Sequence, residues 1–304
     1  MIGHRIAIAF RELRAEFLAA SVVPVLLGAA IAHYRTGAFD AGLLALTLLG
    51  VVFIHLSSNI SNDYFDHRSG NDILNTQFVR PFTGGSRLIQ DGLIAPRTVF
   101  AMSLVFAAAA IAVGVVLTAL RGPLIVVLGA IGLLGGFFYV APPVNLASRG
   151  LGEIVIGLNF GVLTVMGSYF VQARAVSAES FVASLPLAGL IAAVVFINEF
   201  QDMNADARVG KRTLVVRLGL PRASRFFEWL VILSYAPIVI GVGARLIPPA
   251  ALLGLGSLPL AIGAAARARW AYGSPKELAP ANARTILAHM FTGLLLSFGY
   301  LLAG

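Results

Sequence analysis

The stretches "NDYFDHRSGND" (Asn62 to Asp72) and "NEFQDMNADARVGKR" (Asn198 to Arg212) each follow a long apolar segment. Both begin with Asn, an acid, an aromatic residue, any residue and Asp. Such acidic clusters stand out in a chain in which only 12% of residues are charged. The shared pattern indicates either a weak internal repeat or a common composition of helix ends, and the five matching positions do not decide between them.

The composition predicts a membrane protein. Of the 304 residues, 58% are hydrophobic and mean hydropathy is +0.88, whereas soluble proteins carry about 25% charged residues. A span needs about 20 mostly apolar residues. We therefore expect an all-α polytopic membrane protein with a single domain over 1–304. Nine transmembrane helices are expected, at roughly 17–33, 41–62, 98–119, 122–141, 151–172, 181–202, 226–245, 249–266 and 285–303.

The distribution of basic residues predicts the orientation. With these spans, the N-terminus and the three long linkers (63–97, 203–225 and 267–284) lie on one side of the membrane. All but four of the 22 Lys and Arg residues fall on that side, which the positive-inside rule identifies as cytoplasmic. The N-terminus is therefore expected inside and the C-terminus outside, in a multi-pass protein of the cell (inner) membrane. The net charge of +8 is then explained by loops facing anionic headgroups, not by nucleic acid.

Both acidic clusters then lie at cytoplasmic helix ends, where their spacing brings side chains together. Residues four apart share a helix face, so Asn62 pairs with Asp66, and Asn198, Asp202 and Asp206 form a second row. Carboxylate and amide oxygens without Cys suit Mg²⁺, above all where substrate phosphates complete the coordination. The alternative is solvated helix-end charge near headgroups, and the matched spacing of two clusters favours the metal site.

Basic residues near both clusters predict an anionic ligand. Arg80, Arg87, Lys211 and Arg212 can offset the charge of a diphosphate that a metal bridges to the acids. A diphosphate site that opens into an apolar bundle suggests a lipid diphosphate whose tail lies among the helices. The same arginines are also those that the positive-inside rule requires, so each one alone is weak evidence.

Two other polar residues fall within apolar segments. His55 and His289 are single histidines inside predicted spans. Polar groups at membrane depth are costly and usually face the bundle interior. We expect both to be hydrogen-bonded side chains and not metal ligands.

The two acidic stretches resemble those of the UbiA superfamily of intramembrane aromatic prenyltransferases, and the resemblance covers nearly the whole chain. That family is characterised by nine transmembrane helices with aspartate-rich motifs at the cytoplasmic ends of helices 2 and 6. The first motif, N-D-x-x-D-x-x-x-G-x-D, is matched by Asn62, Asp63, Asp66, Gly70 and Asp72. The second is matched by Asn198, Asp202, Asp206, Gly210, Lys211, Arg212, Thr213 and Leu214.

Shorter stretches resemble the naphthoate branch of the family, which acts in menaquinone synthesis. They are "RGLGE" (Arg149 to Glu153), "GSYFVQ" (Gly167 to Gln172) and "GKRTLVVRLG" (Gly210 to Gly219). "RPFTGGSRLIQ" (Arg80 to Gln90) is less typical of that branch. The resemblance implies Mg²⁺-dependent transfer of a polyprenyl group from its diphosphate to 1,4-dihydroxy-2-naphthoate, with loss of the carboxylate. The alternatives are another acceptor, such as 4-hydroxybenzoate or homogentisate, or a cation-coupled transporter.

The resemblance also implies roles for individual residues. Asp66 and Asp202 are expected at the centre of catalysis. Tyr139 is expected to stabilise the allylic cation or orient the acceptor, unless it is a tyrosine of the membrane interface. Arg149 is expected to attract the acceptor carboxylate together with the basic pair of the second motif. The expected ligands of Mg²⁺ are Asn62, Asp63, Asp66, Asp72, Asn198, Asp202 and Asp206.

Overall fold

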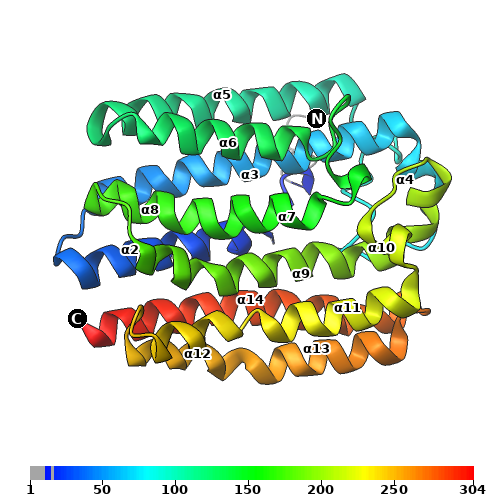
Figure 1. The fold of residues 1–304 in the computed structure, drawn as a ribbon. Coiled ribbons are helices and arrows are strands. Elements are labelled where there is room, and N and C mark those ends of the chain that lie inside the picture. Colours follow the sequence, from blue (N-terminus) through cyan, green and yellow to red (C-terminus); the bar gives the residue numbers. More distant parts are fainter. Residues whose placement is uncertain (1–10, 15–16) are drawn as a thin grey trace.

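Helices are the only regular elements in the part of the chain that the computed structural model describes, residues 11–14 and 17–304 (Figure 1). Apolar segments adopt this form in a bilayer because lipid offers no partner to backbone N–H and C=O groups, which a helix pairs within itself. The all-α prediction is therefore confirmed for these residues.

Within residues 11–14 and 17–304, seven helical rods are long and apolar enough to cross a membrane. Three of these rods are built from consecutive shorter helices. The first joins α7 (Gly152–Ile156), the π-helical η3 (Gly157–Leu163) and α8 (Thr164–Ala173). The second joins α11 (Leu220–Leu233) to α12 (Ala236–Gly243), and the third joins η4 (Pro249–Ser257) to α13 (Leu258–Ala271). The other four are α3 (Ala41–Ser69), α5 (Pro96–Arg121), α9 (Ala178–Arg208) and α14 (Pro275–Ala303).

The two remaining predicted spans are helical but fall outside this group. They correspond to α2 (Ala19–Thr36), with 18 residues, and α6 (Leu124–Phe138), with 15. At 1.5 Å per residue, α6 extends over about 22 Å, less than the hydrocarbon core of about 30 Å. All nine predicted segments are thus helices, whereas seven meet the requirements of a membrane span.

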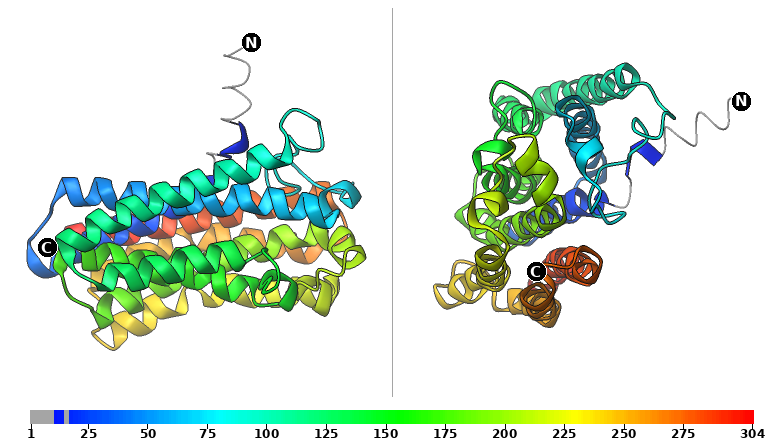
Figure 2. Two further views of the ribbon diagram at one scale, coloured as in Figure 1. Left: turned by 90° about the horizontal axis from the view of Figure 1, so that it is seen from above. Right: turned by 90° about the vertical axis from the view of Figure 1, so that its right-hand side faces the viewer.

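Both acidic motifs lie at one end of the bundle. The helices run side by side, and the short α4 (Asn71–Leu74) and α10 (Leu214–Leu218), which follow α3 and α9, lie at the end opposite to the C-terminus (Figures 1 and 2). α3 and α9 extend beyond their predicted ends, so the motif residues up to Ser69 and Arg208 are helical. Which compartment faces this end remains a prediction from the charge distribution.

α9 forms the centre of the packing. In the apolar 18-residue stretch of α9 that could cross a membrane, 67% of residues are buried. The corresponding share is 17% in α5, which lies at the edge of the bundle. The side chains of Leu187, Leu190, Phe196 and Ile197 are fully buried against neighbouring helices. The second motif is therefore carried by the most enclosed helix, which fixes the position of its carboxylates.

Close contact between α2 and α8 depends on a small residue. Ser168 donates a hydrogen bond of 2.7 Å to the carbonyl of Val25. A Cβ atom on Gly28 would collide with the carbonyl oxygen of Val165 and lie 2.7 Å from Cβ of Ser168. Helices approach this closely in membranes through small residues, which let the backbones meet.

We predict that Gly28→Ala destabilises the protein, because backbone atoms must move to admit the methyl group; overpacking costs about 1–3 kcal/mol. Gly114→Ala, in α5, is the matched control, since no atom lies within 4 Å of its added Cβ and alanine favours a helix. Thermal unfolding in detergent should show a lower Tm for Gly28→Ala only. Equal Tm values for the two variants would contradict the close packing.

Candidate active site

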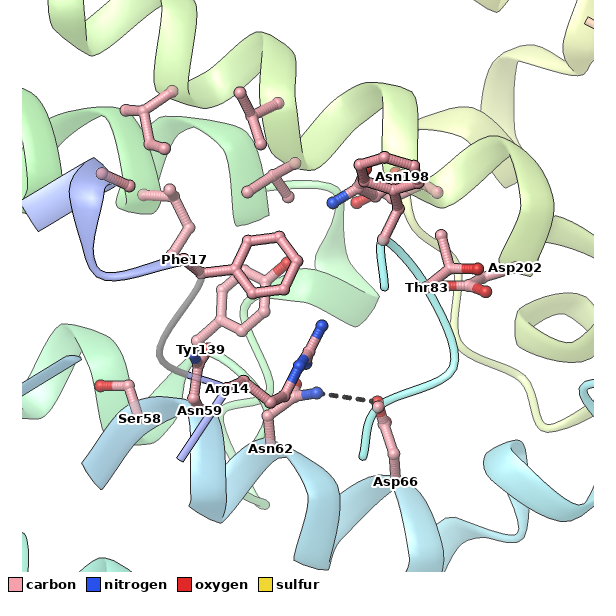
Figure 3. Close-up of a pocket in the computed structure, with 18 of the residues that line it drawn as sticks. Arg14, Phe17, Ser58, Asn59, Asn62, Asp66, Thr83, Tyr139, Asn198 and Asp202 are labelled. Carbon is pink, nitrogen blue, oxygen red and sulfur yellow. Dashed lines mark hydrogen bonds between the residues drawn. The ribbon is translucent and has the colours of Figure 1, made fainter. Parts of the chain in front are cut away.

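A cavity of about 220 Å³ opens between the two acidic motifs. Its lining comes from α2 and the residues before it, α3, α4 and the loop that follows, α9 and the segment after it, α14, and the region of α6, α7 and η3. The end beside the motifs is polar, whereas side chains such as Phe160, Ile191 and Met290 line the remainder. Asp66 and Asp202 face this space from opposite sides (Figure 3). The cavity is therefore amphipathic, with charge at one end only.

The first motif contributes a polar row along α3. His55, Asn59, Asn62 and Asp66 all line the cavity, as their helical spacing predicts. Asn62 donates a hydrogen bond of 3.2 Å to Oδ2 of Asp66 (Figure 3). The helix ends at Gly70, whose φ of 80° is the left-handed conformation that glycine adopts without strain. The chain then turns back over the cavity.

The second motif is bound directly by the segment that follows the first. Asn198, Asp202 and Asp206 line the cavity from one face of α9. Asn75 donates a hydrogen bond of 2.6 Å to Oδ1 of Asp202, and Asn71 donates one of 2.9 Å to Oδ1 of Asp206. These neutral donors stabilise the carboxylates and tie the two motifs together.

Lys211 lies between the motifs. Its Nζ is 3.2 Å from Oδ1 of Asp66 and 3.6 Å from Oδ1 of Asp206. Burial lowers the pKa of Lys211, but the two carboxylates outweigh that effect and hold its pKa well above the usual range. Lys211 is therefore a permanent cation at the polar end of the cavity.

Asp72 is a buried acid at the same end. Gln90 donates a hydrogen bond of 2.8 Å to its Oδ2. Burial, together with the nearby charges of Asp66 and Asp63, raises the pKa of Asp72 to about 8. This carboxyl group therefore holds its proton at neutral pH unless a cation joins it.

Asp63 does not line the cavity, contrary to its expected role as a ligand. Its Oδ2 accepts a hydrogen bond of 2.7 Å from the backbone N–H of Ser86, and its Oδ1 is 4.0 Å from Arg14. Ser86 also donates a hydrogen bond of 2.6 Å to Glu12. Asp63 neighbours Asn62 on the helix and so points to another side, where it anchors the loop and the N-terminal segment.

Of the five basic residues expected to bind substrate, only Lys211 lines the cavity. Arg87 donates to the carbonyls of Asp72 and Asn75 at 3.0 and 3.4 Å and so stabilises the loop. Arg80 forms an exposed ion pair of 3.6 Å with Asp91.

The other two expected substrate-binding arginines are directed elsewhere. Arg149 donates to the carbonyls of Val144 and Pro143 at 2.6 and 3.2 Å, and Arg212 is exposed outside the lining. Sequence reasoning missed Arg14, which lines the cavity (Figure 3). In the sequence, Arg14 was indistinguishable from the other N-terminal charges.

Tyr139 lines the cavity as expected, and so does Phe17 (Figure 3). A Cβ atom on Gly152 would lie 3.0 Å from the Tyr139 ring, so the ring packs directly on the backbone of α7. Glu199, next to the motif residue Asn198, also lines the cavity and was not singled out from the sequence. Its Oε2 accepts a hydrogen bond of 3.4 Å from the N–H of Val215.

The donor set at the polar end suits magnesium that is shared with a phosphate ligand. Among residues 11–14 and 17–304, no three His, Asp or Glu side chains converge on one position. Mg²⁺ usually uses one or two protein carboxylates and completes its shell with waters and substrate phosphates, so paired carboxylates are sufficient. Oδ1 of Asn71, beside Asp206, is buried and has no hydrogen-bond partner in the described part of the chain, which leaves an oxygen for a cation.

We predict that Asp72→Asn stabilises the protein more at pH 9 than at pH 5.5. The pKa of Asp72 is raised in the folded state, so its contribution to stability is fully present below the unfolded pKa of about 3.9 and is lost as pH rises through about 8. Asparagine carries no charge at any pH. Tm should be measured with a chelator present, and a gain that is equal at both pH values would contradict this prediction.

Comparisons with known proteins agree with this geometry. The model of the UbiA prenyltransferase family matches residues 21–300. The chain is 30% identical over 293 residues to the 1,4-dihydroxy-2-naphthoate octaprenyltransferase of Mycobacterium tuberculosis, covering 95% of this chain and 96% of the relative. It is 28% identical over 286 residues to the 2-carboxy-1,4-naphthoquinone phytyltransferase of Synechocystis, covering 93% and 90%.

The fold is also found in a solved structure. A UbiA homolog from Archaeoglobus fulgidus, bound to GPP and Mg²⁺, superposes with a TM-score of 0.63 at 16% identity, covering 94% of this chain and 98% of that one. The resemblance inferred from the two motifs is confirmed. This multi-pass membrane protein belongs to the UbiA prenyltransferase family and is a prenyltransferase.

Proposed function

We propose that the protein transfers a polyprenyl group from polyprenyl diphosphate to 1,4-dihydroxy-2-naphthoate, in menaquinone biosynthesis at the inner membrane. The observation that carries the proposal is the amphipathic cavity, whose carboxylates, amides and Lys211 lie at one end while apolar side chains line the rest. A diphosphate with an isoprenoid tail has the same division. The names of the relatives from M. tuberculosis and Synechocystis support a naphthoate-type acceptor.

The polar end would bind the diphosphate. Asp66, Asp202 and Asp206 would hold Mg²⁺, with Asn62, Asn198 and Asp72 as further oxygen ligands, and Asp63 would act through the loop that it anchors. The bound metal supplies Lewis acidity to the leaving diphosphate oxygens. Lys211 would donate to the same anion, and the amides of Asn71 and Asn75 would keep the carboxylates in position.

The transfer breaks two bonds and forms one. The allylic C–O bond breaks and its electron pair leaves with the diphosphate. The ring carbon that bears the carboxylate then bonds to the allylic carbon, and carbon dioxide leaves so that the ring recovers its aromatic electrons. The ring of Tyr139 would stabilise the allylic cation. The apolar wall would exclude water, which would otherwise convert the cation to an alcohol.

The proposal is tested with purified protein in liposomes, a labelled polyprenyl diphosphate, Mg²⁺ and a panel of aromatic acids. We expect prenylated 1,4-naphthalenediol and carbon dioxide from 1,4-dihydroxy-2-naphthoate. Asp66→Asn and Asp202→Asn should each reduce kcat by at least about 100-fold, because each removes a carboxylate that would hold the Mg²⁺ needed by the leaving diphosphate. Asp91→Asn is the control, since Asp91 is exposed and paired with Arg80.

Two outcomes would count against the proposal. Faster transfer to 4-hydroxybenzoate or homogentisate would replace the naphthoate as acceptor and leave the family assignment intact. Full activity of Asp66→Asn with a chelator present would overturn the metal-bridged diphosphate.

We further predict that Arg14 and Arg149 differ. Arg14 lines the cavity, whereas both hydrogen bonds of the Arg149 side chain go to backbone carbonyls outside it. Arg14→Gln should raise the KM of at least one anionic substrate about 10-fold, since a hydrogen bond to a charged group contributes about 1.5–3 kcal/mol. Arg149→Gln should leave both KM values unchanged. An acceptor KM that rises only in Arg149→Gln would restore the role first expected for Arg149.

A further inference from the structure

Two histidines interrupt the apolar part of the cavity. His55 on α3 and His289 on α14 both belong to its lining. Ile286 and Met290, which line the cavity beside His289 on α14, offer it no good hydrogen-bond partner. Isoleucine has no polar side-chain atom, and the thioether of methionine is only a weak acceptor. An imidazole in such surroundings needs a partner from another helix or from a ligand.

The histidines lie at one depth in the bundle. His55 precedes Asn62 by seven residues on α3, which corresponds to about 10 Å along a helix. His289 follows Asn282 by seven residues on α14, and the Asn282 side chain donates a hydrogen bond of 2.7 Å to Asn198. Asn62 and Asn198 both belong to the polar end, so both histidines lie about 10 Å further into the bundle.

Their hydrogen-bonding states differ. His55 has a partner, because its Nδ1 lies 2.5 Å from Oγ of Ser21. His289 is buried, with only 2% of the residue exposed. Its Nε2 nevertheless has no hydrogen-bond partner among the described residues. The expectation from sequence that both histidines are satisfied is therefore correct for His55 and wrong for Nε2 of His289.

We propose that His289 binds the hydroxyl group of the aromatic acceptor that points away from the acceptor carboxylate. This inference rests on the proposed function and assigns a specificity-determining residue to it. With the carboxylate directed to the cations at the polar end, Arg14 and Lys211, the hydroxyl meta to it enters the apolar part of the cavity. The two groups share one ring, and a hydrogen bond of about 2.8 Å at each extends their reach toward the separation of about 10 Å between the polar end and His289.

The chemistry of the cavity selects this ligand over the prenyl tail. An isoprenoid chain beside His289 would leave the imidazole without a partner, and a buried unsatisfied polar group costs about 1–3 kcal/mol. A phenolic hydroxyl can donate to the unprotonated ring nitrogen or accept from the protonated one. A site that hydrogen-bonds a substrate hydroxyl discriminates against analogues that lack it. His289 would therefore distinguish dihydroxy from monohydroxy aromatic acids.

The test compares two acids that differ only in this hydroxyl, 1,4-dihydroxy-2-naphthoate and 1-hydroxy-2-naphthoate. In liposomes at saturating donor, the dihydroxy acid is assayed as a substrate for its KM, and the monohydroxy acid as a competitive inhibitor for its Ki. His289→Leu should raise the acceptor KM about 10-fold or more, and leave the Ki and the donor KM within about twofold. His289→Gln keeps a hydrogen-bonding side chain and should recover part of the loss. His33→Leu makes the same substitution at an exposed position of α2 and is the control.

Other results would overturn the inference. If His289→Leu weakens both acids equally, His289 supports the cavity wall and does not contact the hydroxyl. If the donor KM rises instead, the prenyl tail occupies this part of the cavity. If all constants stay unchanged, no ligand contacts His289. Failure of the wild-type protein to prenylate any aromatic acid would overturn the proposed function itself and would be distinct from each of these results.

Discussion

The contact of Lys211 with Asp66 and Asp206 is the interaction on which the arrangement of the site depends. Carboxylates from two helices lie at one end of a bundle that is otherwise apolar, and like charges at this depth repel unless a cation joins them. Lys211 supplies that cation from the segment immediately after α9, within 3.2 Å of one motif and 3.6 Å of the other. Breaking a buried ion pair leaves an uncompensated charge. The position of α3 relative to α9 is therefore coupled to this single side chain.

Neutral amides supply the remaining hydrogen bonds that hold the two motifs together. Asn71 and Asn75 donate to Asp206 and Asp202, and Asn282 brings α14 to the same cluster through Asn198. Each amide stabilises an acceptor without adding charge, so the net negative charge needed to attract a divalent cation is retained. The segment that carries Asn71 and Asn75 is held in turn by Arg87 through backbone carbonyls. An arginine that the sequence suggests as a substrate ligand thus contacts the loop backbone instead of the cavity.

Predictions from the sequence of which residues line the cavity were accurate for most residues on helices and inaccurate for arginines in loops. Residues on α3 and α9 were placed correctly on the cavity because helical spacing fixes which side chains share a face. The same rule explains why Asp63 does not line the cavity, because adjacent residues on a helix point in different directions and Asp63 is next to Asn62. The arginines of the loops were misplaced because charge alone does not distinguish a ligand from a loop anchor or a topology signal. Arg14 lies outside the two motifs, and its approach to the cavity depends on contacts with Asp63 and Pro81 that no local pattern reveals.

The polar inventory of the cavity limits what it can bind. At the motif end, acids, amides and Lys211 are largely paired with one another, so an incoming anion gains by exchanging partners within an existing network. In the apolar part, Ser21 already binds His55, and no described residue supplies a partner to Nε2 of His289, which leaves that nitrogen to a ligand or a water molecule. A purely apolar ligand would fill the apolar part of the cavity but would leave Nε2 of His289 without a hydrogen-bond partner. The arrangement therefore favours joint occupation by a molecule with an anionic head and an apolar tail and a second, flat molecule that carries more than one polar group.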